Sequence, residues 1–267
     1  MTEGPQVDVD AEVNASGALL VSCFPSVGFV SSIVAHYLVD KLELELVGGV
    51  RHPNLPSLCL VQDGKPLPPL RFYAGEPICN MERCDKVVLI ASEIQIPSDL
   101  SLPLSSGLID WIVESGVSST IMVDSFAHGV DGRHSIFDED EGMETMLGIG
   151  STETALELLG EIGVPLLKQG VVGGMTGVMM GECRRREVDA LAIIAESDGE
   201  IGQGVIPDAR AAARIIGSMD GLLPAVHLDP EPLLEEAQRI EGQIRDTMAL
   251  HLNPPQDQSN APTGMFG

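Results

Sequence analysis

Four apolar runs along the chain have the length and continuity of buried β-strands. They are GALLVSCF (17–24), DKVVLIAS (85–92), TIMVDS (120–125) and EVDALAIIAES (187–197). LELELVGGV (42–50) alternates Leu with Glu, as a half-buried strand does, and METMLGI (143–149) is a further strand candidate. The apolar run 58–61, Asp63-Gly64 and then LRFYA predict a hairpin, because Asp-Gly favours a tight turn.

Segments with helical periodicity alternate with these strands. We expect a helix capped by Ser26, a helix over 104–115 and a helix from Ser151 or Thr152 to about 161. A helix over 207–219 follows, and Asp229-Pro230-Glu231 is typical of the start of a long helix that reaches about 252. This alternation predicts an α/β fold with a largely parallel central sheet covered by helices on both faces.

The domain organisation follows from the same pattern. Residues 1–15 are acidic and aperiodic and predict a flexible arm, 16–253 form one α/β domain, and 254–267 read as a flexible tail. The uncharged stretch 13–39 is long enough to span a bilayer, but Pro25, Gly28 and its polar residues favour a strand, a turn and a helix. No export signal is recognisable, so we expect a cytoplasmic protein.

Charge narrows the range of partners. The 267 residues include 40 acidic and 15 basic side chains, for a formal net charge of −25. Such a chain is repelled by phosphate, which argues against nucleic acid and anionic membranes as partners. The one tight basic cluster is Arg184-Arg185-Arg186. The acidity is consistent with a salt-rich cytoplasm or with an ordinary acidic protein. Five scattered cysteines imply no disulfide framework.

Three segments carry candidate chemistry, and each also has a purely structural interpretation. Gly173, Gly174, Thr176 and Gly177 precede a predicted helix, where backbone N–H groups could hold a ligand, although small residues also allow close packing. The loop with His128, Asp131, His134 and Asp138 matches no known zinc spacing, and Glu196, Asp198 and Glu200 could hold a hydrated cation. We expect no catalytic residue, metal or cofactor from these patterns.

The final residues, Met265-Phe266-Gly267, are unusual for a polar tail because two of them are large and apolar. A tail with a penultimate aromatic residue and a terminal carboxylate can enter a pocket that supplies a base. An end without any partner is the alternative.

Several motifs together resemble a known family. CFPSVGFVSSIVAHYL (23–38), HPNLPSL (52–58), GVVGGMTGVMMGEC (170–183) and LLEEAQRIEGQI (233–244) are similar in order and spacing to segments of the archaeal proteasome assembly chaperone family, relatives of the second eukaryotic proteasome assembly chaperone. The resemblance covers about residues 16–252.

The resemblance implies an α/β fold, self-assembly into a homo-oligomer such as a tetramer, and ATP-independent action on the proteasome core particle. Met265, Phe266 and Gly267 resemble the hydrophobic-Tyr-any ending with which such proteins dock between α subunits, with Phe in place of Tyr. The family is also described as ATP-grasp-like, so a carboxylate–amine ligase is an alternative. A small-molecule-binding domain is another, for which an apolar pocket near 173–177 would be the structural sign.

Overall fold

The computed structural model describes most of the chain in these ranges: 4–62, 64–76, 86–127, 145–197, 200–201, 204–205, 207–223 and 227–235. One sheet of eight strands organises it, in the spatial order β1-β3-β6-β7-β2-β8-β10-β9. In that order the strands are Gln6–Val9, Glu45–Arg51, Leu70–Gly75, Val87–Ser92, Leu19–Cys23, Ser119–Ala127, Ala190–Ser197 and Met146–Gly150. Two short hairpins, β4–β5 (Leu60–Gln62 and Lys65–Leu67) and β11–β12 (Glu200–Ile201 and Gly204–Val205), lie outside the sheet.

The centre of the sheet is parallel and both flanks are antiparallel. β7, β2, β8 and β10 run parallel as neighbours, whereas β1, β3 and β6 on one side and β9 on the other pair antiparallel. The prediction of an α/β domain with a parallel centre is confirmed, and the antiparallel flanks add a feature that the apolar pattern alone did not reveal. Both faces of the central strands are covered, and all six residues of β7 are buried.

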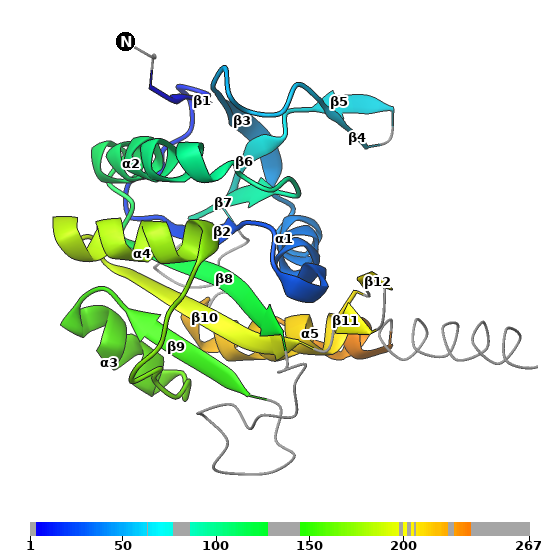
Figure 1. The fold of residues 1–267 in the computed structure, drawn as a ribbon, viewed down its shortest axis with the longest axis vertical. Coiled ribbons are helices and arrows are strands. Elements are labelled where there is room, and N and C mark those ends of the chain that lie inside the picture. Colours follow the sequence, from blue (N-terminus) through cyan, green and yellow to red (C-terminus); the bar gives the residue numbers. More distant parts are fainter. Residues whose placement is uncertain are drawn as a thin grey trace, which may run out of the picture.

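Helices cover the sheet on both faces (Figure 1). α1 (Val30–Lys41) and α5 (Ala209–Met219) pack against one face, and α2 (Ser98–Glu114) and α4 (Gly174–Arg186) against the other. α3 (Glu153–Glu161) follows β9 and adds its buried side chains to the core on the α1 side. Two short 3₁₀ turns, η1 (Val27–Phe29) and η2 (Asp220–Leu222), complete the elements.

Three predicted boundaries differ from the structure. Residues 6–9, expected in a loose arm, form the edge strand β1, whose partner is β3. α2 begins at Ser98 although Pro103 lies inside it, because buried Leu100 and Leu104 extend the apolar stripe of Leu108 and Ile112. The Asp-Gly hairpin joins β4 to β5 rather than to the strand LRFYA, which becomes β6. This hairpin projects from the body at the upper right of Figure 1.

One predicted helix cap is confirmed and another is wrong: Thr152 caps α3, whereas the helix expected to be capped by Ser26 begins only at Val30 as α1, because Gly28 and Phe29 adopt left-handed conformations between them. The Thr152 hydroxyl accepts a hydrogen bond from the Ala155 N–H at 3.2 Å, and the Asp208 carboxylate accepts one from the Ala211 N–H at 2.9 Å. The helix predicted to start at Asp229 is helical over 231–235, while its expected continuation to 252 and the tail 254–267 lie outside the described residues. Within the described ranges, no helix is long and apolar enough to cross a bilayer.

Candidate functional site

A cleft of about 730 Å³ opens at the carboxyl ends of the parallel strands. The turn after β2, the end of β7 and the end of β8 form its floor, and the glycine-rich segment before α4 closes one side. Ligand sites of open α/β sheets lie at this edge, where the connections of neighbouring strands leave to opposite faces of the sheet and open a crevice; here α1 follows β2 on one face and α2 follows β7 on the other. The cleft is therefore the candidate ligand site of this fold.

The glycine-rich segment forms a wall of the cleft. Gly173, Gly174 and Thr176 line it, so the structure brings these three predicted residues together. Gly174 has φ +63°, a left-handed conformation that glycine adopts without strain. Gly177 instead serves packing: a Cβ there would lie 2.1 Å from the Val172 carbonyl oxygen. Both interpretations of this segment therefore hold, for different residues: Gly173, Gly174 and Thr176 line the cleft, and Gly177 allows close packing.

The turn after β2 forms the mouth of the cleft. Gly28 and Phe29 both adopt left-handed backbone conformations, with φ 62° and 53°. Ser26 accepts a hydrogen bond from the Ser31 N–H at 3.0 Å, and Ser125 donates to the Val27 carbonyl at 2.6 Å, so both ends of the turn are fixed. The Phe29 side chain remains 47% exposed, although the residue occupies a conformation that is strained for a non-glycine residue.

Asp124 lies in β8 and lines the cleft. Its Oδ1 accepts a hydrogen bond from the Ser125 N–H at 2.8 Å, and the Thr176 side chain is a second hydrogen-bond partner. Burial raises the pKa of Asp124, and these two hydrogen bonds counteract that rise only in part. Both partners are uncharged, and within the described part of the chain no Lys, Arg or His forms an ion pair with this carboxylate.

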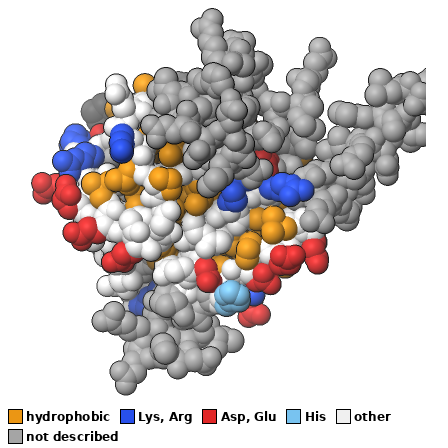
Figure 2. All heavy atoms as spheres, turned by 90° about the horizontal axis from the view of Figure 1, so that it is seen from below, with side chains coloured by type: hydrophobic (Ala, Val, Ile, Leu, Met, Phe, Trp, Pro, Cys, Tyr) orange, Lys and Arg blue, Asp and Glu red, His pale blue; other side chains and the backbone are white. Residues whose placement is uncertain are grey.

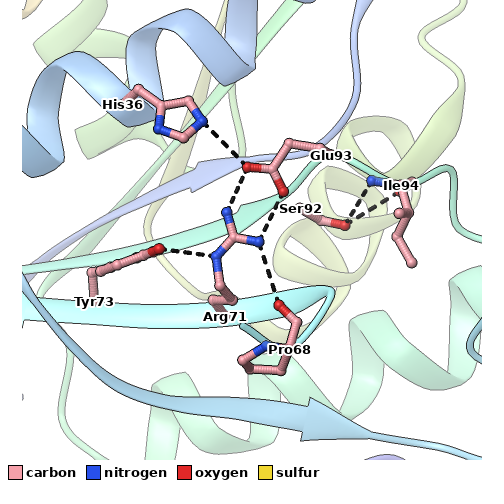
Figure 3. A network of polar contacts seen from close by, with 7 residues as sticks. All are labelled: His36, Pro68, Arg71, Tyr73, Ser92, Glu93 and Ile94. Atoms are coloured by element: carbon pink, nitrogen blue, oxygen red, sulfur yellow. Dashed lines mark hydrogen bonds and ion pairs between the residues drawn. The ribbon is translucent and has the colours of Figure 1, made fainter. Parts of the chain in front are cut away.

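Glu93, at the end of β7, is the second acidic residue of the cleft, and it belongs to a polar network (Figure 3). Arg71 of β6 is 1% exposed and donates from Nη1 to Glu93 Oε2 at 2.9 Å. Arg71 also donates to the Tyr73 hydroxyl at 2.9 Å and to the Pro68 carbonyl at 3.3 Å, and His36 Nε2 lies 3.5 Å from Glu93 Oε1. Burial would raise the pKa of Glu93, but His36 and Arg71 outweigh it and lower the pKa to about 2.

The remaining lining is mostly apolar. It includes Phe24, Phe29 and Phe126 together with Leu147, Met175 and Ile194. Among the described lining residues the charged ones are Glu93 and Asp124, and none is basic. Cys23 lies beneath the cleft, where complete burial and then the neighbouring Glu93 and Asp124 carboxylates raise the pKa of its thiol well above the usual range. A buried, protonated thiol is a poor nucleophile, so Cys23 belongs to the core.

The other candidate segments fall partly outside the described residues. The histidine loop with His128, Asp131, His134 and Asp138 lies outside them, as do Met265, Phe266 and Gly267. Glu196 is described, and its Oε2 accepts a hydrogen bond from the Thr145 N–H at 3.1 Å. Across the described ranges, no three His, Cys, Asp or Glu residues come together as metal ligands.

The basic cluster Arg184–Arg186 is engaged within the fold. Arg184 donates to the Ser151 carbonyl at 3.0 Å, Arg185 pairs with Glu182 within α4, and Arg186 pairs with Asp110 of α2 at 2.6 Å. Figure 2 shows the molecule from below, with acidic side chains around the margin of this face and hydrophobic ones gathered between them. The cluster lies in the last turn of α4, where basic side chains interact favourably with the helix dipole, and Arg186 joins α4 to α2.

The sequence analysis missed Glu93, Asp124 and Arg71. Two signals were present: Glu93 directly follows a buried strand, and Asp124 is a carboxylate within an apolar one. Charged residues at such positions need partners, and two of the partners here, Arg71 for Glu93 and Thr176 for Asp124, come from other segments of the chain.

Comparisons with known proteins cover nearly the whole chain. The profile of the PAC2 family matches residues 20–248. An uncharacterised protein of Methanocaldococcus jannaschii is 25% identical over 242 residues, which are 91% of this chain and 90% of that protein.

Two solved structures from Pyrococcus furiosus have the same fold. PbaA, an archaeal homologue of proteasome-assembly chaperone, superposes with a TM-score of 0.78 at 26% identity over 94% of both chains. PbaB, an archaeal proteasome activator, superposes with a TM-score of 0.74 at 16% identity, covering 92% of this chain and 99% of that one, a likeness of fold.

Proposed function

Since this chain belongs to the PAC2 family, we propose that it is a proteasome assembly chaperone or activator-like protein that binds the core particle without ATP. The observation that carries the proposal is the match to Pyrococcus furiosus PbaA over 94% of both chains at 26% identity. The match to the PAC2 profile confirms the family resemblance that the sequence motifs indicated.

The proposed contact with the proteasome is the segment Met265, Phe266 and Gly267, which enters a pocket between α subunits. Two large apolar side chains after a polar stretch have the composition of a docking peptide. A single tripeptide binds weakly, so the proposal includes self-assembly into a homo-oligomer that presents several tails to one ring. The acidic surface complements basic pockets on the partner.

A pull-down of the core particle from the same organism tests the tail. Deletion of residues 265–267 should abolish capture, while the circular dichroism spectrum and melting temperature stay unchanged. Gln258→Ala, in the same polar stretch, is the matched control and should bind as the parent does. Undiminished capture by the deletion variant would overturn the tail contact.

A second substitution probes the aromatic position. Phe266→Tyr restores the hydroxyl of the hydrophobic-Tyr-any pattern and should tighten binding by about 2- to 10-fold, the equivalent of one hydrogen bond. Phe266→Ala should weaken binding as much as the deletion does. Equal binding by all three side chains would show that position 266 does not enter a pocket.

The acidic residues of the cleft argue against the alternative function, an ATP-dependent carboxylate–amine ligase. Nucleotide phosphates are commonly held by Lys or Arg or by a metal, and the charged residues among the described lining are both acidic. A nucleotide-dependent ligase should show a higher melting temperature with saturating ATP and Mg²⁺. We expect no such shift, and a shift of several degrees would favour the ligase.

A further inference from the structure

The cleft concentrates the aromatic residues of a chain that has few of them. Six Phe, two Tyr and one Trp make up the aromatic content of all 267 residues. Three of the phenylalanines, Phe24, Phe29 and Phe126, line this one cleft and come from two different segments of the chain. Aromatic rings bind apolar groups well, and their faces also attract cations.

The charge of the cleft has one sign. Both charged residues among its described lining, Glu93 and Asp124, are acidic. Glu93 already has a cationic partner in Arg71, whose Nη1 lies 2.9 Å from Oε2, and His36 Nε2 lies 3.5 Å from Oε1. Among the described residues, the hydrogen-bond partners of Asp124 are Ser125 and Thr176, which are uncharged, while burial disfavours its ionised form. A positive group beside Asp124 would supply the missing partner.

We propose that this cleft binds a small organic cation with an apolar body, whose charged head lies beside Asp124 and whose body packs against the phenylalanines. The volume of about 730 Å³ is in the range of small-molecule sites. A mostly apolar lining with a few convergent polar groups is typical of such sites. An anionic ligand would face two carboxylates in a region of low dielectric, so the same geometry disfavours it.

The mouth of the cleft supports the assignment. Phe29 occupies a left-handed conformation with φ 53°, which is strained for a residue with a side chain. The Ser26–Ser31 hydrogen bond at 3.0 Å and the Ser125–Val27 hydrogen bond at 2.6 Å hold the turn in this conformation. Strained backbone conformations that are held in place by neighbouring hydrogen bonds are common at ligand sites. Here it places an aromatic ring, 47% exposed, where a bound apolar body would cover it.

Calorimetric titration with three probes of matched size tests the charge requirement: 2-phenylethylammonium, neutral 2-phenylethanol and anionic 3-phenylpropanoate. Hexylammonium tests the requirement for an aromatic body. Because a chain of net charge −25 attracts any cation, the titrations are done with about 0.5 M NaCl, which screens distant charges. We expect saturable one-site binding of at least one ammonium probe, and weaker or absent binding of the alcohol and the carboxylate.

Variants locate the site. Asp124→Asn should weaken binding of the ammonium probe about tenfold or more, the loss expected for a charge-assisted hydrogen bond. Phe126→Leu should weaken it several-fold. Glu157→Gln, which removes an exposed carboxylate of α3, is the matched control for net charge and should bind as the parent does.

Three outcomes would overturn the proposal: no saturable binding of either ammonium probe, equal loss in Asp124→Asn and Glu157→Gln, or tighter binding of the carboxylate. A blocked Gly-Phe-Lys-Phe-Gly peptide separates the two sources of such a cation. If the peptide binds while neither free amine does, the cleft holds a basic side chain of a protein partner and the small-molecule assignment is wrong. No proteasome is present, so the result is independent of the proposed function.

Discussion

The two carboxylates of the cleft lie in different environments. Glu93 meets a buried guanidinium and an imidazole, so its charge is neutralised within the fold. Asp124 is also partly buried, but among the described residues its hydrogen-bond partners are a hydroxyl and a backbone N–H. The first arrangement is complete without a ligand, and the second is completed by a cation.

This difference separates a structural role from a binding role. Arg71 of β6 bonds to Glu93 at the end of β7, so the position of the Glu93 side chain depends on the antiparallel pair β6–β7. Thr176 joins the Asp124 side to the start of α4, next to the glycine-rich segment. Substitutions on the Glu93 side should therefore change stability, and substitutions on the Asp124 side should change binding. Four predictions test this division, and we take the largest effect first.

Removal of the Glu93 charge should have the largest effect on stability. Glu93→Gln leaves the Arg71 guanidinium, 1% exposed, without its carboxylate. Breaking one side of a buried ion pair should lower the free energy of unfolding by about 3 kcal/mol, measured by urea denaturation. Adding Arg71→Met to Glu93→Gln removes the buried charge that the single variant leaves unpaired, so the double variant should recover much of the loss. A double variant no more stable than the single one would contradict the ion-pair explanation.

Gly177→Ala should have the next largest effect, on the Asp124 side. The new Cβ would lie 2.1 Å from the Val172 carbonyl oxygen, so α4 or the glycine-rich segment must move. We expect a loss of about 1–3 kcal/mol, as for other overpacked positions. Gly181→Ala is the control in the same helix, since nothing lies within 4 Å of its Cβ, and it should stabilise by up to about 1 kcal/mol.

The same two alanine variants also test whether the Asp124 side of the cleft binds the ammonium probe. Gly177 follows Thr176, so movement there should weaken binding of 2-phenylethylammonium while the Arg71–Glu93 pair stays intact. Gly181→Ala should leave binding unchanged. Equal behaviour of the two variants in urea denaturation would show that the close approach at position 177 is not needed.

Acid should remove the stability that the Glu93 pair provides. The pKa of Glu93 falls from 4.5 to about 2 in the fold. A lowered carboxyl pKa contributes stability that is fully present above 4.5 and is lost as the pH falls from about 4.5 toward 2. The stability difference between the parent and Glu93→Gln should therefore shrink over that range. Glu157→Gln, measured beside it, should show no such convergence.

Much of the fold could be predicted because the central strands are buried on both faces and therefore appear as continuous apolar runs. The edge strand β1 was missed: Gln6–Val9 alternates Val with polar residues as a half-buried strand does, but the run is only four residues long and lies in an acidic stretch. α2 was predicted over 104–115 and begins earlier, at Ser98, because buried Leu100 and Leu104 extend its apolar stripe across Pro103. In both cases contacts with distant segments, and not the local sequence pattern, determine where the element begins.

The site was less predictable for the same reason. The glycine-rich wall is contiguous in the sequence, and three of its four predicted residues line the cleft. Asp124 and Glu93 owe their properties to Thr176 and Arg71, which come from other strands and helices. No local pattern shows that one carboxylate will meet a guanidinium and the other only a hydroxyl, because that depends on the sheet order.

The smallest effect, and the most direct test of the contrast, is the pH dependence of Asp124→Asn. Burial raises the pKa of Asp124 above its ordinary 3.8, so the folded state retains a proton that the unfolded state releases. Stability attributable to this group is therefore lost as the pH rises from 3.8 through the raised pKa, the opposite sign to Glu93. Asn cannot ionise, so the variant should gain stability relative to the parent over that rise in urea denaturation.

A cation in the cleft should reverse that gain. Saturating 2-phenylethylammonium favours the ionised Asp124 carboxylate, so at neutral pH it should stabilise the parent more than Asp124→Asn, which binds the probe more weakly. The stability gap between the two proteins should then close or change sign, while the gap between the parent and Glu93→Gln should keep its sign. If the gap between the parent and Asp124→Asn stays constant across pH and with the probe, Asp124 is as fully compensated as Glu93. In that case the two sides of the cleft do not differ in the way proposed.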